Sequence, residues 1–81
     1  MERNMEKDLV EYIVKSLVDD PSAVNVAVVE GEKSTILELR VAPDDIGKVI
    51  GKHGRIAKAI RTVLQAATAK GGKHTVLNIL D

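Results

Sequence analysis

The chain of 81 residues contains no cysteine, tryptophan or phenylalanine, and Tyr12 is its one aromatic residue. Without cysteine there is neither a disulfide framework nor a zinc–thiolate site. Without a set of aromatic side chains, the chain cannot build an RNA-recognition sheet or a general platform on which bases stack. No apolar run approaches the roughly 20 residues that span a bilayer, and the first residues lack the apolar core of a signal peptide. We therefore expect a small cytoplasmic protein with no membrane partner.

Catalytic and metal-binding patterns are equally scarce. The segment Gly47–His53 resembles a phosphate-binding P-loop, but its glycine spacing is one residue short and His53 stands where a hydroxyl would bind Mg²⁺. The two histidines form no helical pair and give no metal site. Asp44 and Asp45 are adjacent and point in different directions, which disfavours a catalytic carboxylate pair. We expect no enzyme, no metal, no cofactor and no small-molecule substrate.

The charge of the chain is zero overall but unevenly distributed. Residues 1–34 carry eight acidic and four basic side chains, whereas residues 35–81 carry four acidic and eight basic ones. No acidic residue lies between Ile46 and Leu80, and this stretch holds seven cations: Lys48, Lys52, Arg55, Lys58, Arg61, Lys70 and Lys73. A half of the chain that is rich in basic residues is typical of a protein with a phosphate-binding face. A helix face that is merely exposed to solvent gives the same pattern of Lys and Arg residues.

Apolar periodicity and turn residues divide the chain into six elements. The first three are a helix over about 5–19 and strands over about 24–29 and 35–41. A short helix follows, which begins at Ala42–Asp45 and ends at Gly51. The last two are a helix over about 55–69 and a strand over 74–80. The carboxylates of Asp44 and Asp45 are expected to favour the start of the short helix. The first two strands are close enough to form an antiparallel hairpin. The pattern α-β-β-α-α-β predicts an α+β fold of two layers, with helices on one face of a three-stranded sheet and residues 1–81 as a single domain.

Two glycines interrupt the helical pattern at Gly51-Lys52-His53-Gly54. Residues without Cβ atoms let the main chain approach a ligand closely. The helix that follows directs free N–H groups and the positive end of its dipole at the same place, which favours a phosphate. A plain helix cap and tight corner between two helices is the alternative interpretation.

The run Val49–Ile56, with Ile60 after it, resembles the helix-GxxG-helix core of the KH family. The order of elements is that of the prokaryotic type II arrangement, and residues 41–52 look like the small stand-alone bacterial KH proteins of the KhpA type. That resemblance covers nearly the whole chain. It implies a single-stranded RNA-binding, chaperone-like protein or post-transcriptional regulator of the bacterial cytoplasm. It also implies a second KH-containing partner of the KhpB (Jag) type and a link to cell-wall biogenesis and cell shape.

We expect phosphates to be held by the loop and its neighbour, namely Gly51, Lys52, His53, Gly54 and Arg55. These contacts position a strand without reading its sequence. Unstacked bases are expected in an aliphatic groove formed by Ile46, Val49, Ile50 and Ile56, with Leu39 and Arg40 from the second strand. Lys48 and Lys58 are expected to flank this groove. Alternatively, Ile50 and Ile56 are core residues, and Ile60 is favoured as one.

The competing interpretation is a protein-interaction module in which RNA binding is secondary. Alanines are frequent in the last helix and offer a flat surface for a partner helix: Ala57, Ala59, Ala66, Ala67 and Ala69. A homodimer or a heterodimer would present two loops and so gain avidity.

Overall fold

The computed structural model describes residues 4–68 and 74–80 of the chain. Its helices are α1 (Met5–Leu17), α2 (Ile46–Ile50) and α3 (Arg55–Thr68), and its strands are β1 (Asn25–Glu30), β2 (Ser34–Arg40) and β3 (His74–Ile79). Three one-turn 3₁₀ segments, Pro21–Ala23, Pro43–Asp45 and Lys52–Gly54, connect them. Ala69, Lys70 and Lys73, with the predicted end of the last helix, lie outside the described residues.

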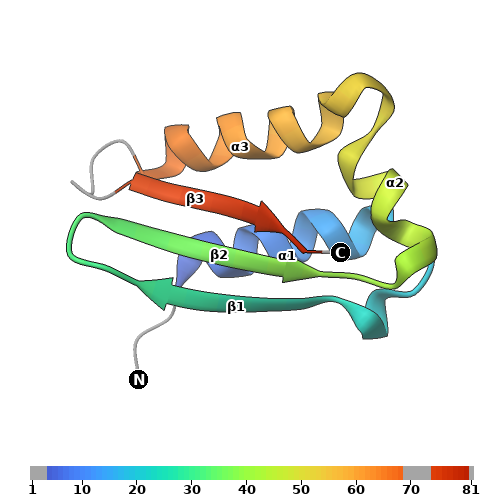
Figure 1. Ribbon diagram of the computed structural model, residues 1–81, viewed down its shortest axis with the longest axis horizontal. Helices are drawn as coiled ribbons and strands as arrows, with labels where there is room; N and C mark the ends of the chain where they lie inside the picture. The colour runs from blue at the N-terminus through green and yellow to red at the C-terminus, as the bar shows by residue number, and fades with distance from the viewer. Residues whose placement is uncertain (1–3, 69–73, 81) are drawn as a thin grey trace.

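The three strands form one mixed sheet in the order β1-β2-β3. β1 and β2 pair as the predicted antiparallel hairpin, with Val28 opposite Leu37. β3 runs parallel to β2, with Leu77 opposite Leu37. A parallel neighbour needs a long crossover, which α2, the glycine loop and α3 supply. β3 is therefore an edge strand and the one that lies beside α3 (Figure 1).

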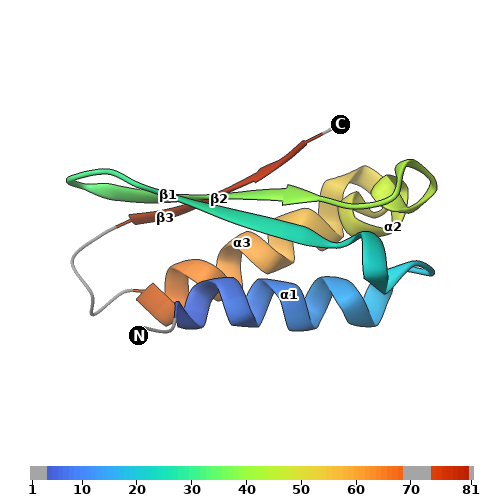
Figure 2. The same cartoon turned by 90° about the horizontal axis from the view of Figure 1, so that it is seen from below.

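Both long helices cover the same face of the sheet, and the other face is open (Figure 2). Residues of β2 alternate accordingly: Thr35, Leu37 and Leu39 are buried, whereas Arg40 is exposed. These observations confirm the two-layer α+β architecture expected of a type II KH domain.

The core lies between this sheet and the buried sides of the helices. On α1 the buried residues are Val10 and Val14, while Met5 at its start is 77% exposed. On α3 the buried residues are Ala57, Ile60 and Leu64. Val63, at 43% exposed, and Ala67, also exposed, do not belong to the buried side of α3. α3 covers the edge of a small sheet, and such a position buries only a narrow side of a helix.

Candidate nucleic-acid interface

The glycine loop has a backbone that ordinary residues adopt only with strain. α2 ends where the Gly51 N–H donates to the Gly47 carbonyl, and the Gly54 N–H then closes the turn on the Gly51 carbonyl at 3.1 Å. Gly51, His53 and Gly54 have φ values of 78°, 58° and 72°. Positive φ is easily reached by glycine but costs other L-residues about 1–2 kcal/mol, so His53 is the strained member of the turn.

The two glycines are required for different reasons. A Cβ on Gly51 would lie 2.5 Å from Cγ1 of Ile56, so the missing side chain lets α2 and the start of α3 pack together. A Cβ on Gly54 would meet no atom within 4 Å. The space beside Gly54 is therefore open, as a site needs where a ligand approaches the main chain closely.

Exposed basic side chains surround this loop. Lys52, His53, Arg55 and Lys58 are all exposed. None of the ion pairs among the described residues involves Lys52, Arg55 or Lys58. Their charges are consequently not neutralised by carboxylates of that part of the chain, and the backbone turn and these side chains together suit an anion.

Lys48 differs from the other cations because two carboxylates hold it. Its Nζ donates to Asp19 Oδ2 at 2.6 Å and to Asp45 Oδ1 at 3.2 Å. These hydrogen bonds, the one to Asp19 first, raise the pKa of the Lys48 ammonium above its ordinary value. The structure thus places Lys48 in a bridge between α2 and the end of α1, away from the group of unpaired cations.

Asp45 stands at the start of α2, but its hydrogen bonds go to the turn after α1. Its side chain makes no capping hydrogen bond to that helix. It is 2% exposed and accepts the backbone N–H groups of Asp20 and Asp19 at 3.0 and 3.2 Å, because the turn after α1 lies within its reach. The hydrogen bond from Asp20, with those from Asp19 and Lys48, lowers the pKa of the Asp45 carboxyl despite its burial. Asp45 and Lys48 therefore fix the helix that leads into the loop.

The groove expected from the sequence needs correction. Val49 and Leu39 are fully buried core residues, so neither can receive a base. Arg40 lies on the open face of the sheet, as the alternation along β2 requires. The physical reason is the strand order: β3 separates β2 from α3, so the strand that faces the helix is β3. Ile46 and Ile56 are partly buried, and Ile50 is 38% exposed.

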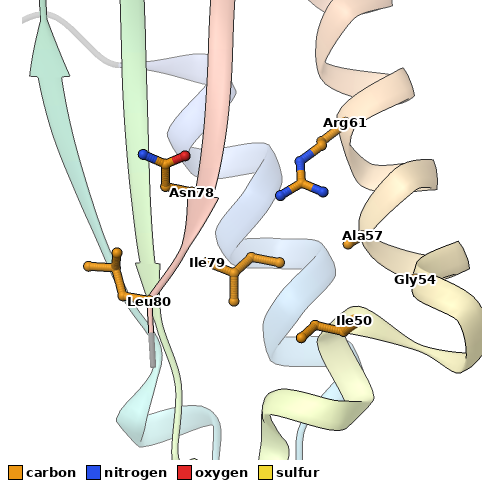
Figure 3. Close-up of a pocket in the computed structure, with 7 residues that line it drawn as sticks. All are labelled: Ile50, Gly54, Ala57, Arg61, Asn78, Ile79 and Leu80. Atoms are coloured by element: carbon orange, nitrogen blue, oxygen red, sulfur yellow. The ribbon is translucent and has the colours of Figure 1, made fainter.

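The structure shows instead a pocket of about 420 Å³ between α3 and the edge of β3 (Figure 3). It is lined by the end of α2, the loop, α3 and β3, through Ile50, Gly54, Ala57, Arg61, Asn78, Ile79 and Leu80. Ile50 and Ile79 lie between β3 and the helix, and the guanidinium of Arg61 reaches from α3 toward β3. The pocket thus adjoins the loop at Gly54.

Five residues of this pocket were missed by sequence reasoning, namely Ala57, Arg61, Asn78, Ile79 and Leu80. Arg61 stood among the cations of the acid-free stretch, but nothing in the pattern indicated that it faces a pocket. Finding the others needs the position of β3 in the sheet, which the order of elements does not give.

Other kinds of site are not supported by the described residues. In residues 4–68 and 74–80 there is no group of three or more His, Cys, Asp or Glu side chains that could hold a metal ion. In the same part of the chain, no helix has the length and apolar character needed to cross a membrane.

Comparison with known proteins agrees with the fold. Residues 7–79 match the family model described as KhpA/KhpB, KH domain. The chain is 62% identical to RNA-binding protein KhpA of Clostridium acetobutylicum over 91% of its own length and 99% of that protein. It is 59% identical to RNA-binding protein KhpA of Borreliella burgdorferi over 94% and 93% of the two chains. For the protein of the same name from Aquifex aeolicus, the identity is 55% over 93% and 95%.

These names describe RNA-binding proteins and not enzymes. The match extends through every helix and strand except the first two residues of α1. The chain therefore belongs to the KhpA/KhpB family of KH domains, which is not an enzyme family, as the inventory of its side chains predicts.

Proposed function

We propose that this chain binds single-stranded RNA, with the Gly51–Gly54 loop on the phosphates and the pocket between α3 and β3 receiving a base. The observation that carries the proposal is the turn with positive φ at three of its four residues, open beside Gly54 and bordered by cations that form no ion pair within residues 4–68 and 74–80. A KH domain clamps the nucleic-acid backbone with such a GxxG loop. The names of the relatives support RNA as the polymer.

In this proposal, phosphates lie against the backbone N–H groups of residues 52–55 and the side chains of Lys52, His53 and Arg55. Lys58, one turn further along α3, meets the next phosphate. Lys48 acts indirectly, since its bridge to Asp19 and Asp45 holds α2 in place. The base lies against aliphatic carbon, mainly that of Ile50 and Ile79, because no aromatic side chain is available for stacking.

The test is charge reversal of the loop. Lys52→Asp with His53→Asp should abolish retention of single-stranded RNA while leaving the circular dichroism spectrum and the unfolding midpoint close to wild type. Lys15→Asp with Ser16→Asp on the exposed side of α1 is the matched control, because it makes the same change in residue charge on another element, outside the loop. Equal retention of RNA by both variants would contradict the proposal. Single-stranded DNA of the same sequence distinguishes recognition of the 2′-hydroxyl from backbone binding alone.

The resemblance to the KhpA proteins extends the proposal to the cell. Residues 1–81 act as one KH domain in the bacterial cytoplasm, as an RNA chaperone or post-transcriptional regulator linked to cell-wall and cell-shape homeostasis. A KhpB-type protein with its own KH domain is the expected heteromeric partner. Co-purification of the two proteins, with and without ribonuclease, tests whether RNA or a direct contact joins them.

A protein-interaction role is the second candidate, and one observation favours it. Ala59, Val63 and Ala66 are exposed on one side of α3, with Val63 at 43%. Ala57 does not contribute to that surface, because it is buried at the pocket. If Val63→Glu dissociates an oligomer seen by light scattering while the loop variant leaves RNA retention unchanged, the interaction role is primary. The reverse result supports the RNA-binding role.

A further inference from the structure

Arg61 is the one cationic side chain of the pocket, and the phosphate-binding loop does not include it. We propose that Arg61 selects the base that enters this pocket, favouring a base that presents two neighbouring hydrogen-bond acceptors on one edge. Guanine and cytosine have such an edge, whereas adenine and uracil do not. The inference rests on the proposed function, because it assigns the specificity of the same site.

The guanidinium of Arg61 is fixed by the edge of β3. Its Nε and Nη2 both donate to the carbonyl of Leu77, at 3.3 and 3.2 Å. Arginine has five N–H donors, so three remain on the two terminal nitrogens. A guanidinium whose plane is already set loses less conformational freedom when it binds a ligand than a mobile one does.

The register of the sheet explains why Leu77 offers this carbonyl. The N–H groups of His74 and Leu80 donate to Lys33 and Leu39 on the β2 side. Backbone groups alternate in direction along a strand, so those of Leu77 and Ile79 face the free edge, where α3 lies. Arg61 satisfies the Leu77 carbonyl there. No ion pair among the described residues involves Arg61, so its remaining donors are not taken by a carboxylate of that part of the chain.

The rest of the pocket is suited to the flat face of a base. Ile50 and Ile79 supply aliphatic surface, and Ala57 is small enough to leave the wall of α3 hollow (Figure 3). A base lying on this surface would turn an edge toward the guanidinium. Apolar contact thus provides affinity for any base, and the donors decide which base fits best.

The chemistry of the donors sets the preference. Two parallel N–H groups match O6 and N7 of guanine, the commonest specific partner of arginine. They also match O2 and N3 of cytosine. On adenine an amino group lies next to N7 and N1, and on uracil an N–H lies between the two carbonyls, so each would set a donor against a donor. A glutamine at the same position has one donor and one acceptor and would match adenine instead.

The test uses short oligouridines, about six nucleotides long, whose one central position is uridine, adenosine, guanosine or cytidine. Wild type should bind the guanosine or cytidine form about 10-fold more tightly than the adenosine and uridine forms. The affinities of the guanosine and cytidine forms show which of these two bases the pocket prefers. Arg61→Gln should move the preference to adenosine, and Arg61→Lys, which keeps the charge but not the planar fork, should reduce the preference to about twofold or less.

A second measurement avoids variants altogether, in case substitution of Arg61 disturbs β3. Replacing the preferred central base with 7-deazaguanosine or 3-deazacytidine removes one acceptor and should abolish the preference of the wild-type protein. Equal affinities for the four natural oligonucleotides, or a preference that survives both the deaza base and Arg61→Gln, would overturn the inference. If Lys52→Asp with His53→Asp still abolishes binding in that event, the proposed function stands and only the role of Arg61 fails.

Discussion

Alanine substitution of the two loop glycines separates backbone strain from steric contact. At Gly54 the φ of 72° is the one obstacle among the described residues, since a Cβ meets nothing within 4 Å. We expect Gly54→Ala to lower the free energy of unfolding by about 1–2 kcal/mol, the cost of a left-handed L-residue. Gly51 combines φ 78° with ψ 172°, a region used essentially by glycine alone, which costs about 1–3 kcal/mol for other residues.

The Gly51 substitution also meets Ile56. Its Cβ would lie 2.5 Å from Cγ1 and 2.9 Å from Cβ of that side chain, so α2 and α3 must move apart. Overpacking of this kind costs about 1–3 kcal/mol. The sum for Gly51→Ala is about 2–6 kcal/mol, a large share of the roughly 4–12 kcal/mol expected for a domain of this length.

Urea denaturation followed by circular dichroism measures both losses, with unchanged m-values as evidence of two-state unfolding. Ile56→Ala provides the control for the steric part. In the Gly51→Ala background it removes Cγ1 and Cδ1, including the nearest clashing atom, and leaves only the Cβ contact at 2.9 Å, so the double variant should lose less stability than the two single losses added together. If Gly51→Ala proves no more destabilising than Gly54→Ala, or if the two losses at Gly51 and Ile56 simply add, the packing role of Gly51 is refuted.

Three further predictions concern the bridge, the loop and the core. Because the pKa of Asp45 is lowered in the folded chain from its ordinary 3.8, its stabilising contribution is present above that pH and is lost as the pH falls through the folded value. Asp45→Asn should therefore make the free energy of unfolding depend less on pH in the acid range, as measured by urea unfolding at several pH values. An unchanged pH dependence would contradict the role of the bridge. Lys52→Ala should reduce the magnitude of the log–log salt slope for single-stranded RNA by roughly 0.7, measured by fluorescence anisotropy; an unchanged slope would mean that Lys52 contacts no phosphate. Leu64→Ala should cost about 2–5 kcal/mol in urea unfolding because Leu64 is 1% exposed, whereas Val63→Ala on the same helix should cost far less.

Much of the fold could be predicted because local signals and packing agree. Apolar periodicity located β2, in which Leu37 and Leu39 are buried, and Gly51 with Gly54 located the turn between α2 and α3. The hairpin followed from the short connection between its strands. These features depend on residues close together in the sequence, where periodicity and turn chemistry act directly.

The pocket could not be predicted because it depends on pairing between distant segments. The apolar periodicity of β2 indicates which of its faces is buried. It does not indicate which strand pairs with the edge of β2 that β1 leaves free. Placing β3 there moves Arg40 away from α3 and brings Leu77 opposite Arg61. In the same way, α2 is too short for its apolar pattern to distinguish the buried Val49 from the exposed Ile50.

A chain with no net charge can hold an anionic polymer because part of its acidic charge is engaged with Lys48 and part lies far from the loop. Asp19 and Asp45 bind Lys48 and so offset a cation that lies off the loop. Glu30 and Glu32 belong to the β1–β2 hairpin, which lies at the opposite end of the sheet from α2 (Figure 1). The chain extends 34 Å along its longest axis, several times the Debye length of about 8 Å at physiological salt. Charges at the two ends therefore act almost independently, and the local group of Lys52, Arg55 and Lys58, rather than the overall charge, sets the field that an approaching phosphate meets.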